Sequence, residues 1–561
     1  MVQKFLYTKG LFILFFGFIF GHLHGSESET LFFNGPVYSG IPDSPLMSSV
    51  LIRGSKIICT GKKNECLKKS GKKVREFNLK GQFLMPGFQD AHMHVLEAGL
   101  NEDQCFFTRM GSLKKFISEL QKCARQSGNV SWIQGAGVNI NHVQSLTGSP
   151  RKLIDSVIGN KPVLILDDIG HGALANSEAL KRAGYKDHQK DPGGGLLGRE
   201  KDQGSLNGIL WENAQQKVRD AAWISSSENN RYAESKLQSS LDYLSTLGIT
   251  SVSDAGGYWT RDDERHWYAL NRRHPLSVRA SNALYVFPDQ NKKDQTEQIV
   301  NRFSNQSGSF LRFNQVKIYV DGILSQGTSV LLEPYERGAD LIQTSRNGFS
   351  YFSETDLNDY VQAFDKSGFQ IHFHATGDRA VRMALDAVEK AQKKNGTRDR
   401  RHRITHLYLV HPQDIQRFKS LGVWADFQLA PETLDDAYRK ELQPMIGERT
   451  KRLLPFNEFY RAGVNTIISS DWDAESASPF EKIQTLLESS KVAVKSRAKL
   501  IELMTRGVSR LLHQDHLTGT IEAGKQADLI LLDKNLLTVP VSQISEVRVL
   551  GTMIAGEFIF D

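Results

Sequence analysis

The amino-acid sequence predicts an α/β protein in which a (β/α)8 barrel is joined to a small β-domain made from both ends of the chain. Three observations support this prediction: helix–glycine–strand units that recur from about residue 230, histidines and aspartates at the carboxyl ends of several predicted strands, and alternating β-type runs at both chain ends. Parallel strands with helical crossovers explain the recurring units. A chain of 561 residues, 40% of them hydrophobic, is long enough for more than one core.

The recurring unit is an amphipathic helix, a glycine and a short β-rich run. In one unit, Ser353 and Asp356 predict a helix start, Gly368 predicts its end, and FQIHFHATGD is the strand. Such units suit either a barrel or an open sheet. We favour the barrel, because no GxGxxG motif follows an early strand and polar residues end several different strands. Another unit has leucines at helical spacing before ITSVSDAGG, namely Leu237, Leu241, Leu244 and Leu247.

The chain ends have a different pattern from the middle. Residues 30–85 and 517–561 are short alternating runs such as SVLIRGSKIICTG and ADLILLDKN, which we expect to pair into one β-domain. This leaves residues 86–516 for the barrel. Within them, residues 95–230 form a Gly-rich, irregular stretch that includes DPGGGLLGRE, and we interpret it as an insertion over the barrel mouth rather than a linker.

Residues 1–25 predict a signal peptide. Lys4 and Lys9 precede an apolar run from Leu11 to Gly21, and a polar stretch with Gly25 follows. The run suits the ~7–15 residues of a signal-peptide core and is shorter than the ~20 of a transmembrane helix. We therefore expect export, a periplasmic or secreted location, and no stable membrane insertion after cleavage near Gly25. An uncleaved anchor is the alternative.

All four cysteines lie in the N-terminal quarter of the chain. An even number suits an oxidising compartment. Pairing Cys59 with Cys66 and Cys105 with Cys123 would close the shortest loops, but four buried free thiols explain the sequence equally well.

The charge distribution argues against nucleic acid as a partner. The formal net charge of +7 is spread along the chain, and no basic tract stands beside an aromatic ladder. We expect a small-molecule substrate instead. The sequence leaves the formation of a homo-oligomer open.

A pair of histidines is the first candidate for metal binding. In QDAHMHV, His92 and His94 are two residues apart, so on a strand both side chains point to the same face and can reach one metal ion. Asp90 shares that face. Two strand histidines can equally be satisfied polar residues at a sheet end, so this motif alone does not decide.

More histidines and an aspartate end later strands. His372 and His374 share one face of QIHFHATGD, His406 ends RITH, and Asp471 lies in IISSDWD. Imidazole and carboxylate ligands favour Zn²⁺ or a similar divalent metal. The pattern predicts a centre for one or two ions, in which His372 has the alternative role of supporting His374.

A lysine completes the candidate centre. VKIYVDG places Lys317, Tyr319 and Asp321 on one face of a strand. A buried cation needs a partner or a modification. We expect Lys317 either to form an ion pair with Asp321 or Asp471, or to carry a carboxylate on its amine and bridge two metal ions.

Together the segments resemble the amidohydrolase superfamily, and specifically amidohydrolase family 3. The PGFxDAHxH and HATGDRA segments together are highly specific. The resemblance implies a distorted (β/α)8 TIM barrel with a β-sandwich formed by the N- and C-terminal segments. It runs from about residue 30 to residue 561 and includes GQFLMPGFQDAHMHV, GHGALANSEAL, GGGLLGRE, GILWENA, VKIYVDG, HFHATGDRAVRMALDA, RHRITH, IISSDWD and GTIEAGKQADLILLD.

The resemblance also implies an activity and a ligand set. The activity is hydrolysis of a carbon–nitrogen bond other than a peptide bond, in an amide, an N-substituted amide or a cyclic amide. Asp471 would take a proton from a water that the metal activates and pass it to the leaving nitrogen. The implied metal ligands are His92 and His94 for one ion, His374 and His406 for the second, Lys317 as a carboxylated bridge, and Asp471.

Three further positions resemble family positions near the pocket, His171 and Asn176 in GHGALANS and Glu212 in GILWENA. We assign them, together with Asp321, to substrate binding. Two have structural alternatives, because Asn176 can cap the helix that follows it and Glu212 can be a solvated acid at a helix start.

One position departs from the family pattern. The family usually has glutamate immediately before the histidine of RITH, and this chain has Thr405. The ligand set is intact, but the orientation of His406 and the substrate preference are put in question. Two alternatives therefore stay open: an exported metal- or ligand-binding protein with impaired catalysis, and hydrolysis of esters or phosphoesters on the same centre.

Overall fold

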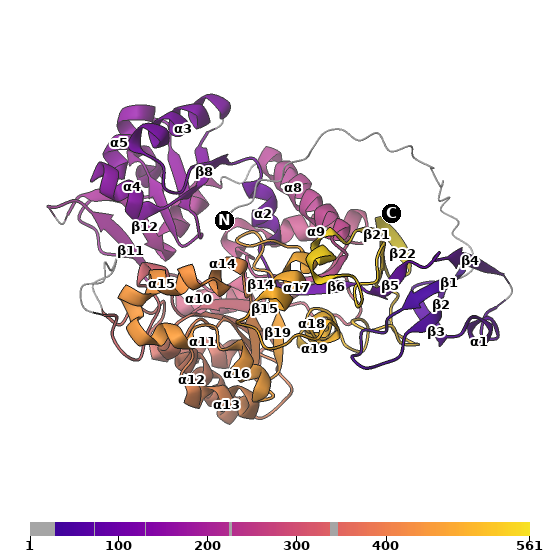
Figure 1. The fold of residues 1–561 in the computed structure, drawn as a ribbon. Helices are drawn as coiled ribbons and strands as arrows, with labels where there is room; N and C mark the ends of the chain where they lie inside the picture. The colour runs from indigo at the N-terminus through magenta and orange to yellow at the C-terminus, as the bar shows by residue number, and fades with distance from the viewer. Residues whose placement is uncertain are drawn as a thin grey trace.

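The computed structural model describes residues 28–560 except 72, 129–130, 203, 224–226 and 337–345. Figure 1 shows a central barrel with its helices, a separate lobe of early residues on one side, and a sheet that joins the two chain ends on the other side. The predicted signal peptide lies outside the described residues. Among the residues that are described, no helix is long and apolar enough to cross a membrane.

Eight parallel strands form the barrel, in the order β19-β18-β17-β16-β15-β14-β13-β6. A backbone bridge joins Met93, the last residue of β6, to Trp472 in the segment that follows β19, so the ring is nearly closed. The predicted fold class is confirmed. The strands are β6 Phe88–Met93, β13 Ile249–Asp254, β14 Arg279–Tyr285, β15 Leu311–Tyr319, β16 Gln370–Ala375, β17 Arg403–His406, β18 Trp424–Phe427 and β19 Thr466–Ile468.

The helices form where the periodicity predicted them. The Ser353 hydroxyl caps α11 by accepting a hydrogen bond from the backbone N–H of Asp356, and Gly368 follows the helix with φ 96°. Only glycine adopts that backbone conformation readily, so the chain turns there into β16. The helices around the barrel are α2 Val95–Asn101, α8 Ser227–Thr246, α9 Glu264–Arg273, α10 Lys292–Val300, α11 Glu354–Lys366, α12 Asp378–Asn395, α13 Pro412–Leu421, α14 Pro431–Leu434, α15 Asp436–Ile446, α16 Phe456–Arg461, α17 Pro479–Glu488, α18 Arg497–Leu503 and α19 Arg506–Leu511.

The two chain ends share one eight-stranded sheet. Its order is β22-β21-β20-β5-β1-β2-β3, and β4 also pairs with β1. Phe32, Ile52 and Leu529 pack in its core. A disulfide joins Cys59 in β3 to Cys66 in the short helix α1, Lys63–Leu67. The strands are β1 Glu29–Val37, β2 Met47–Arg53, β3 Lys56–Gly61, β4 Val74–Asn78, β5 Phe83–Pro86, β20 Leu529–Leu532, β21 Val549–Ile554 and β22 Glu557–Phe560.

Residues 105–222, which we call the inserted subdomain, form the lobe with α3, α4 and α5 in Figure 1. Its sheet has the order β11-β12-β10-β9-β8-β7, and a disulfide joins Cys105 to Cys123. Its elements are β7 Cys105–Phe106, α3 Leu113–Gln126, β8 Ile133–Val138, α4 Ile140–Thr147, α5 Pro150–Ile158, β9 Val163–Asp167, β10 Gly172–Ala175, α6 Ser177–Arg182, β11 Gly195–Arg199, β12 Leu206–Glu212 and α7 Gln216–Ala222.

The expectation of an irregular stretch here is wrong, because these residues form a sheet with helices, and some of their glycines lie in strands packed against side chains. A Cβ on Gly135 would lie 2.6 Å from the Phe107 ring, and one on Gly172 would lie 2.6 Å from Ile140. These close approaches let the strands pack against side chains that a larger residue would displace. In DPGGGLLGRE, Gly195 and Gly198 lie in β11, whereas Gly193 and Gly194 form the turn that precedes it.

Candidate metal centre and active site

The candidate ligands lie together at the carboxyl ends of the barrel strands. His92 ends β6 with His94 just beyond, Lys317 lies in β15, and Asp471 follows β19. The parallel register brings the later histidines to the same rim, because Tyr319 pairs with His374 and Ala375 pairs with His406. We call this ring of six side chains the rim: His92, His94, Lys317, His374, His406 and Asp471.

Asp471 is the carboxylate on which the rim histidines converge. Its Oδ1 lies 3.1 Å from His92 Nε2 and 3.5 Å from His94 Nε2, and its Oδ2 lies 3.8 Å from His406 Nδ1. Burial alone would raise the pKa of Asp471, but these histidines outweigh it and hold the pKa well below the usual range. The carboxylate is therefore charged and suited to bind a cation.

The histidines offer free lone pairs to a metal. Burial, and then the neighbouring Lys317, holds the pKa of His92 well below its ordinary value, so the ring is neutral. His374 donates from Nε2 to the Gly322 carbonyl at 3.1 Å, and its ring centroid lies 4.3 Å from that of His406. The Nδ1 atoms of His374 and His94 are buried without a hydrogen-bond partner in the described part of the chain. Such unsatisfied nitrogens fit a metal site.

Lys317 is fully buried beside the ligands. Its Nζ lies 3.2 Å from His92 Nε2, and burial lowers its pKa to about 7. The alternative of an ion pair with Asp321 is wrong, since the Asp321 carboxylate accepts backbone N–H groups from Val330, Thr376 and Gly377. The negative charge of Asp471 opposes this lowering of the Lys317 pKa, because it favours the ammonium form.

A second set of close ligand atoms lies beneath the rim, formed by His92, His372 and Asp426. Arg403 contacts two members of this set, with Nη2 2.7 Å from His372 Nδ1 and Nε 3.6 Å from Asp426 Oδ2. A buried guanidinium repels a metal ion, so this set is not a second metal site. His372 Nε2 lies 3.0 Å from His92 Nδ1, which gives His372 the supporting position, beneath His92 rather than beside His374.

The backbone is strained at three site residues. Glu212, His406 and Asp471 have φ of 54°, 76° and 62°, a region that side chains other than glycine rarely adopt. Such conformations cost on the order of 1–3 kcal/mol each and persist where the surrounding structure holds them. Two of the three, His406 and Asp471, belong to the rim, and Glu212 lies in the inserted subdomain.

The inserted subdomain contributes a histidine and a carboxylate. His171 Nδ1 lies 2.6 Å from Glu212 Oε2, and the His171 ring lies 5.2 Å from that of His374. Glu212 is 1% exposed and also receives hydrogen bonds from Thr328 and Tyr351, so the alternative of a solvated acid is wrong. Of the four residues assigned to substrate binding, His171 and Glu212 thus lie beside the rim.

Two other residues assigned to substrate binding have all their polar atoms engaged elsewhere. Asn176 is fully buried; its Oδ1 accepts from the N–H groups of Val163 and Ala179, and its Nδ2 donates to Lys161. Asp321 is equally buried and holds the loops after β15 and β16 through backbone groups, and burial raises its pKa to about 7. Their roles are structural, and for Asn176 this is the alternative of helix capping.

Thr405 is fully buried in β17, where it is the register partner of His374. Its hydroxyl donates to the Phe373 carbonyl at 2.7 Å, while Gln428 accepts from the backbone N–H of His406. Gln428 was missed from the sequence, as was Arg403; an arginine inside a buried strand run was the available signal for the latter. The Tyr319 ring, singled out only by its strand face, stacks on His374 at 4.3 Å.

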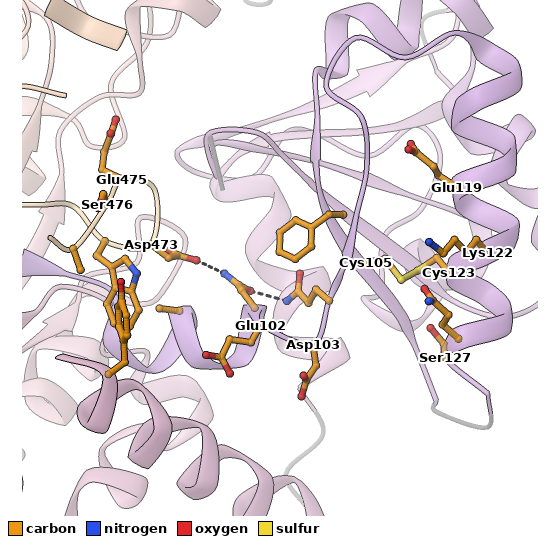
Figure 2. Close-up of a pocket in the computed structure, with 18 of the residues that line it drawn as sticks. Glu102, Asp103, Cys105, Glu119, Lys122, Cys123, Ser127, Asp473, Glu475 and Ser476 are labelled. Carbon is orange, nitrogen blue, oxygen red and sulfur yellow. Dashed lines mark hydrogen bonds between the residues drawn. A yellow bond between two sulfur atoms is a disulfide. The ribbon is translucent and has the colours of Figure 1, made fainter. Parts of the chain in front are cut away.

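A cleft of about 1150 Å³ opens next to the rim, between the inserted subdomain and the loops that follow the last strands. Figure 2 shows Asp473 and Glu475 on one wall and Glu119 with the Cys105–Cys123 disulfide on the other. Trp472, the residue after Asp471, also lines the cleft. The inserted subdomain therefore forms one side of a cleft whose other side begins at the residue after Asp471.

The comparison with known families decides the identity of the chain. A model of the amidohydrolase family matches residues 75–560, which include the rim and both residues of the His171–Glu212 pair. The chain belongs to the amidohydrolase family. Within that family match, candidate His and Asp metal ligands are gathered at the barrel rim.

Relatives extend over nearly the whole chain. The Arabidopsis thaliana protein LONG AFTER FAR-RED 3 is 27% identical over 96% of this chain and 92% of its own length. An N-substituted formamide deformylase of Arthrobacter pascens is 24% identical over 91% of this chain and 94% of its own length. An uncharacterized metal-dependent hydrolase from Pyrococcus furiosus has the same fold, with a TM-score of 0.69 at 23% identity, covering 91% of this chain and all of that one.

Proposed function

We propose that this amidohydrolase cleaves a carbon–nitrogen bond other than a peptide bond, in an amide, an N-substituted amide or a cyclic amide. One observation supports this most directly: several histidines and a buried lysine surround a single charged carboxylate, Asp471, at the barrel rim. The relative from Arthrobacter pascens, whose name is N-substituted formamide deformylase, supports the bond type.

The rim residues divide the chemistry among them. His92, His94, Lys317, His374 and His406 would hold the metal together with Asp471. A divalent ion in such a site lowers the pKa of water from 15.7 toward ~7. Asp471 lies among these ligands as a carboxylate, and we assign to it the acceptance of the proton of the attacking water.

We further propose that the metal is Zn²⁺ or a similar divalent ion, one or two per chain, and that Lys317 is carboxylated. A lysine whose pKa is lowered to about 7 is partly neutral near neutral pH, and a neutral amine is the form that reacts with carbon dioxide. Elemental analysis of protein purified with bicarbonate, against protein purified without it, tests both points. Metal content that is independent of bicarbonate would argue against the carboxylated lysine.

The location is proposed from the first 25 residues alone. We propose export with cleavage near Gly25, to the periplasm or the medium. The mature N-terminus of protein expressed with its leader tests this directly. A retained Met1 on membrane-bound protein would favour the uncleaved anchor.

The experiment for the activity is a substrate panel with the metal-loaded protein. The panel contains N-substituted formamides, simple amides, cyclic amides and matched esters, and the variant is Asp471→Asn. We expect turnover of amides by the wild type, and loss of turnover with at least partial retention of metal in the variant. Cleavage of esters alone would overturn the bond type, and thermal stabilisation by an unconsumed amide would favour a binding protein.

A further inference from the structure

Glu212 determines which nitrogen of the His171 ring carries a hydrogen. The Tyr351 hydroxyl donates to Glu212 Oε2 at 2.7 Å, the Thr328 hydroxyl donates to Oε1 at 2.6 Å, and His171 Nδ1 lies 2.6 Å from Oε2. A carboxylate that already receives two hydroxyl hydrogens serves as an acceptor. His171 therefore keeps a hydrogen on Nδ1, and any proton that it gains or loses is exchanged at Nε2.

The backbone of the inserted subdomain and a loop of the barrel both hold the His171–Glu212 pair in place. Gly172 and Trp211 are register partners in β10 and β12, and the backbone N–H of Glu212 donates to the His171 carbonyl at 2.7 Å just beyond them. A Cβ on Gly322 in the barrel would lie 2.0 Å from Glu212 Oε1 and 2.2 Å from the Thr328 hydroxyl, so the missing side chain leaves room for this carboxylate and its hydrogen-bond donor. The inserted subdomain is thus locked to the barrel at the point where His171 meets the rim.

The second ring nitrogen of His171 is unused by the protein. The ring centroid lies 5.2 Å from that of His374 and 5.9 Å from that of Tyr319, while Nε2 has no hydrogen-bond partner among the described residues. The side chain is 14% exposed. An imidazole held by a carboxylate at one nitrogen and open at the other is the usual arrangement of a proton-transfer residue.

We propose that His171 is a catalytic residue that delivers the proton to the leaving nitrogen, and that Glu212 is its positioning residue. This inference rests on the proposed amide hydrolysis. The proposal assigns proton acceptance and proton delivery to different residues. Asp471 lies among the candidate metal ligands, where the water would be activated, and His171 lies next to His374 on the side of the inserted subdomain.

The step balances in atoms and electrons. Water loses a proton to Asp471 and its oxygen forms a bond to the carbonyl carbon. The C–N bond then breaks, its electron pair stays on nitrogen, and nitrogen takes the proton from His171 Nε2. The proton on Asp471 returns to His171 through solvent, which leaves one carboxylic acid and one amine per water consumed.

A purely structural role for the pair predicts a different outcome. If His171 only fastened the inserted subdomain, its loss would slow every substrate alike. A proton donor matters most where the leaving nitrogen is basic, because an electron-poor amine departs with little help. The dependence of the rate on the leaving group therefore separates the two roles.

The test uses two probes with one acyl group, the 4-methoxyanilide and the 4-nitroanilide of formic acid. The variants are His171→Asn and Glu212→Gln, and the matched control is His188→Asn, an exposed histidine on the same subdomain. Metal content and the melting temperature are measured for each. We expect His171→Asn to keep its metal and to lose about 100-fold or more in kcat/KM on the methoxyanilide but less than about tenfold on the nitroanilide.

Glu212→Gln is expected to show the same asymmetry to a smaller extent, and His188→Asn to behave as wild type. Equal losses on both anilides in His171→Asn and in Glu212→Gln, with active wild type, would overturn this inference and leave the proposed function standing. Absence of turnover by metal-loaded wild type on both anilides and on the wider amide panel would overturn the proposed function, and the inference with it.

Discussion

The barrel rim and the inserted subdomain both bring histidines to one site, but they hold them differently. The rim histidines share one carboxylate, Asp471, and leave nitrogens such as His374 Nδ1 without a partner. His171 instead has its own buried carboxylate, Glu212, at 2.6 Å. Histidines that surround one carboxylate and keep a free nitrogen are suited to bind a cation. A histidine that is hydrogen-bonded to a separate carboxylate is suited to transfer a proton.

The largest expected effect comes from breaking the rim. His406→Ala removes an imidazole next to Asp471 and His374, so we expect loss of metal and a fall in kcat/KM of about 1000-fold or more. Atomic absorption and steady-state kinetics measure both. An active variant with full metal content would show that the rim does not depend on this histidine.

The next effect concerns the inserted subdomain alone. Replacing Cys105 and Cys123 by serine removes the disulfide between β7 and α3, and we expect a loss of about 2–4 kcal/mol in the stability of the subdomain. Metal content should stay at the wild-type level, because the rim belongs to the barrel. Calorimetry and elemental analysis on the same sample check this, and a parallel loss of metal would mean that the two regions are not separable.

A smaller effect is expected beneath the rim. His372 supports His92 from below and receives a hydrogen bond from Arg403. His372→Asn should weaken metal affinity by about 10–100-fold without abolishing binding, as is usual for residues that orient a ligand. Competition with a chelator measures the change. An unaltered affinity would remove His372 from the description of the centre.

The smallest effect is expected at Asn176. Its side chain caps α6 and braces the start of β9, so Asn176→Ala should lower stability by about 1–3 kcal/mol. The value of kcat/KM at a temperature where the variant is folded should not change. A drop in kcat/KM without a drop in stability would restore the substrate-binding role predicted for this residue.

The sequence predicted the rim better than the inserted subdomain, for a physical reason. Strand periodicity places His92 and His374 on definite faces, and parallel strands must end at the same edge, so their meeting is a consequence of geometry. No comparable rule joins His171 to Glu212, because that contact depends on which strands of the inserted sheet are neighbours.

The sequence also did not show what surrounds the Asp321 carboxylate or which side chains pack against the glycines of the inserted subdomain. Asp321 shares a strand face with Lys317 by spacing, yet the loops after β15 and β16 enclose its carboxylate in backbone N–H groups. The glycines of the inserted subdomain suggested loops, but positions such as Gly172 are small because Trp211 and Ile140 pack against them. Both errors come from contacts between distant segments.

The central claim is that the rim holds a divalent metal while His171 serves the substrate. The most direct test is elemental analysis of the purified protein, with metal per chain measured for wild type, His374→Ala and His171→Asn under identical metal-replete conditions. We predict one to two divalent ions in wild type and in His171→Asn, and loss of metal in His374→Ala. No metal in wild type, or equal metal in wild type and His374→Ala, would contradict the account.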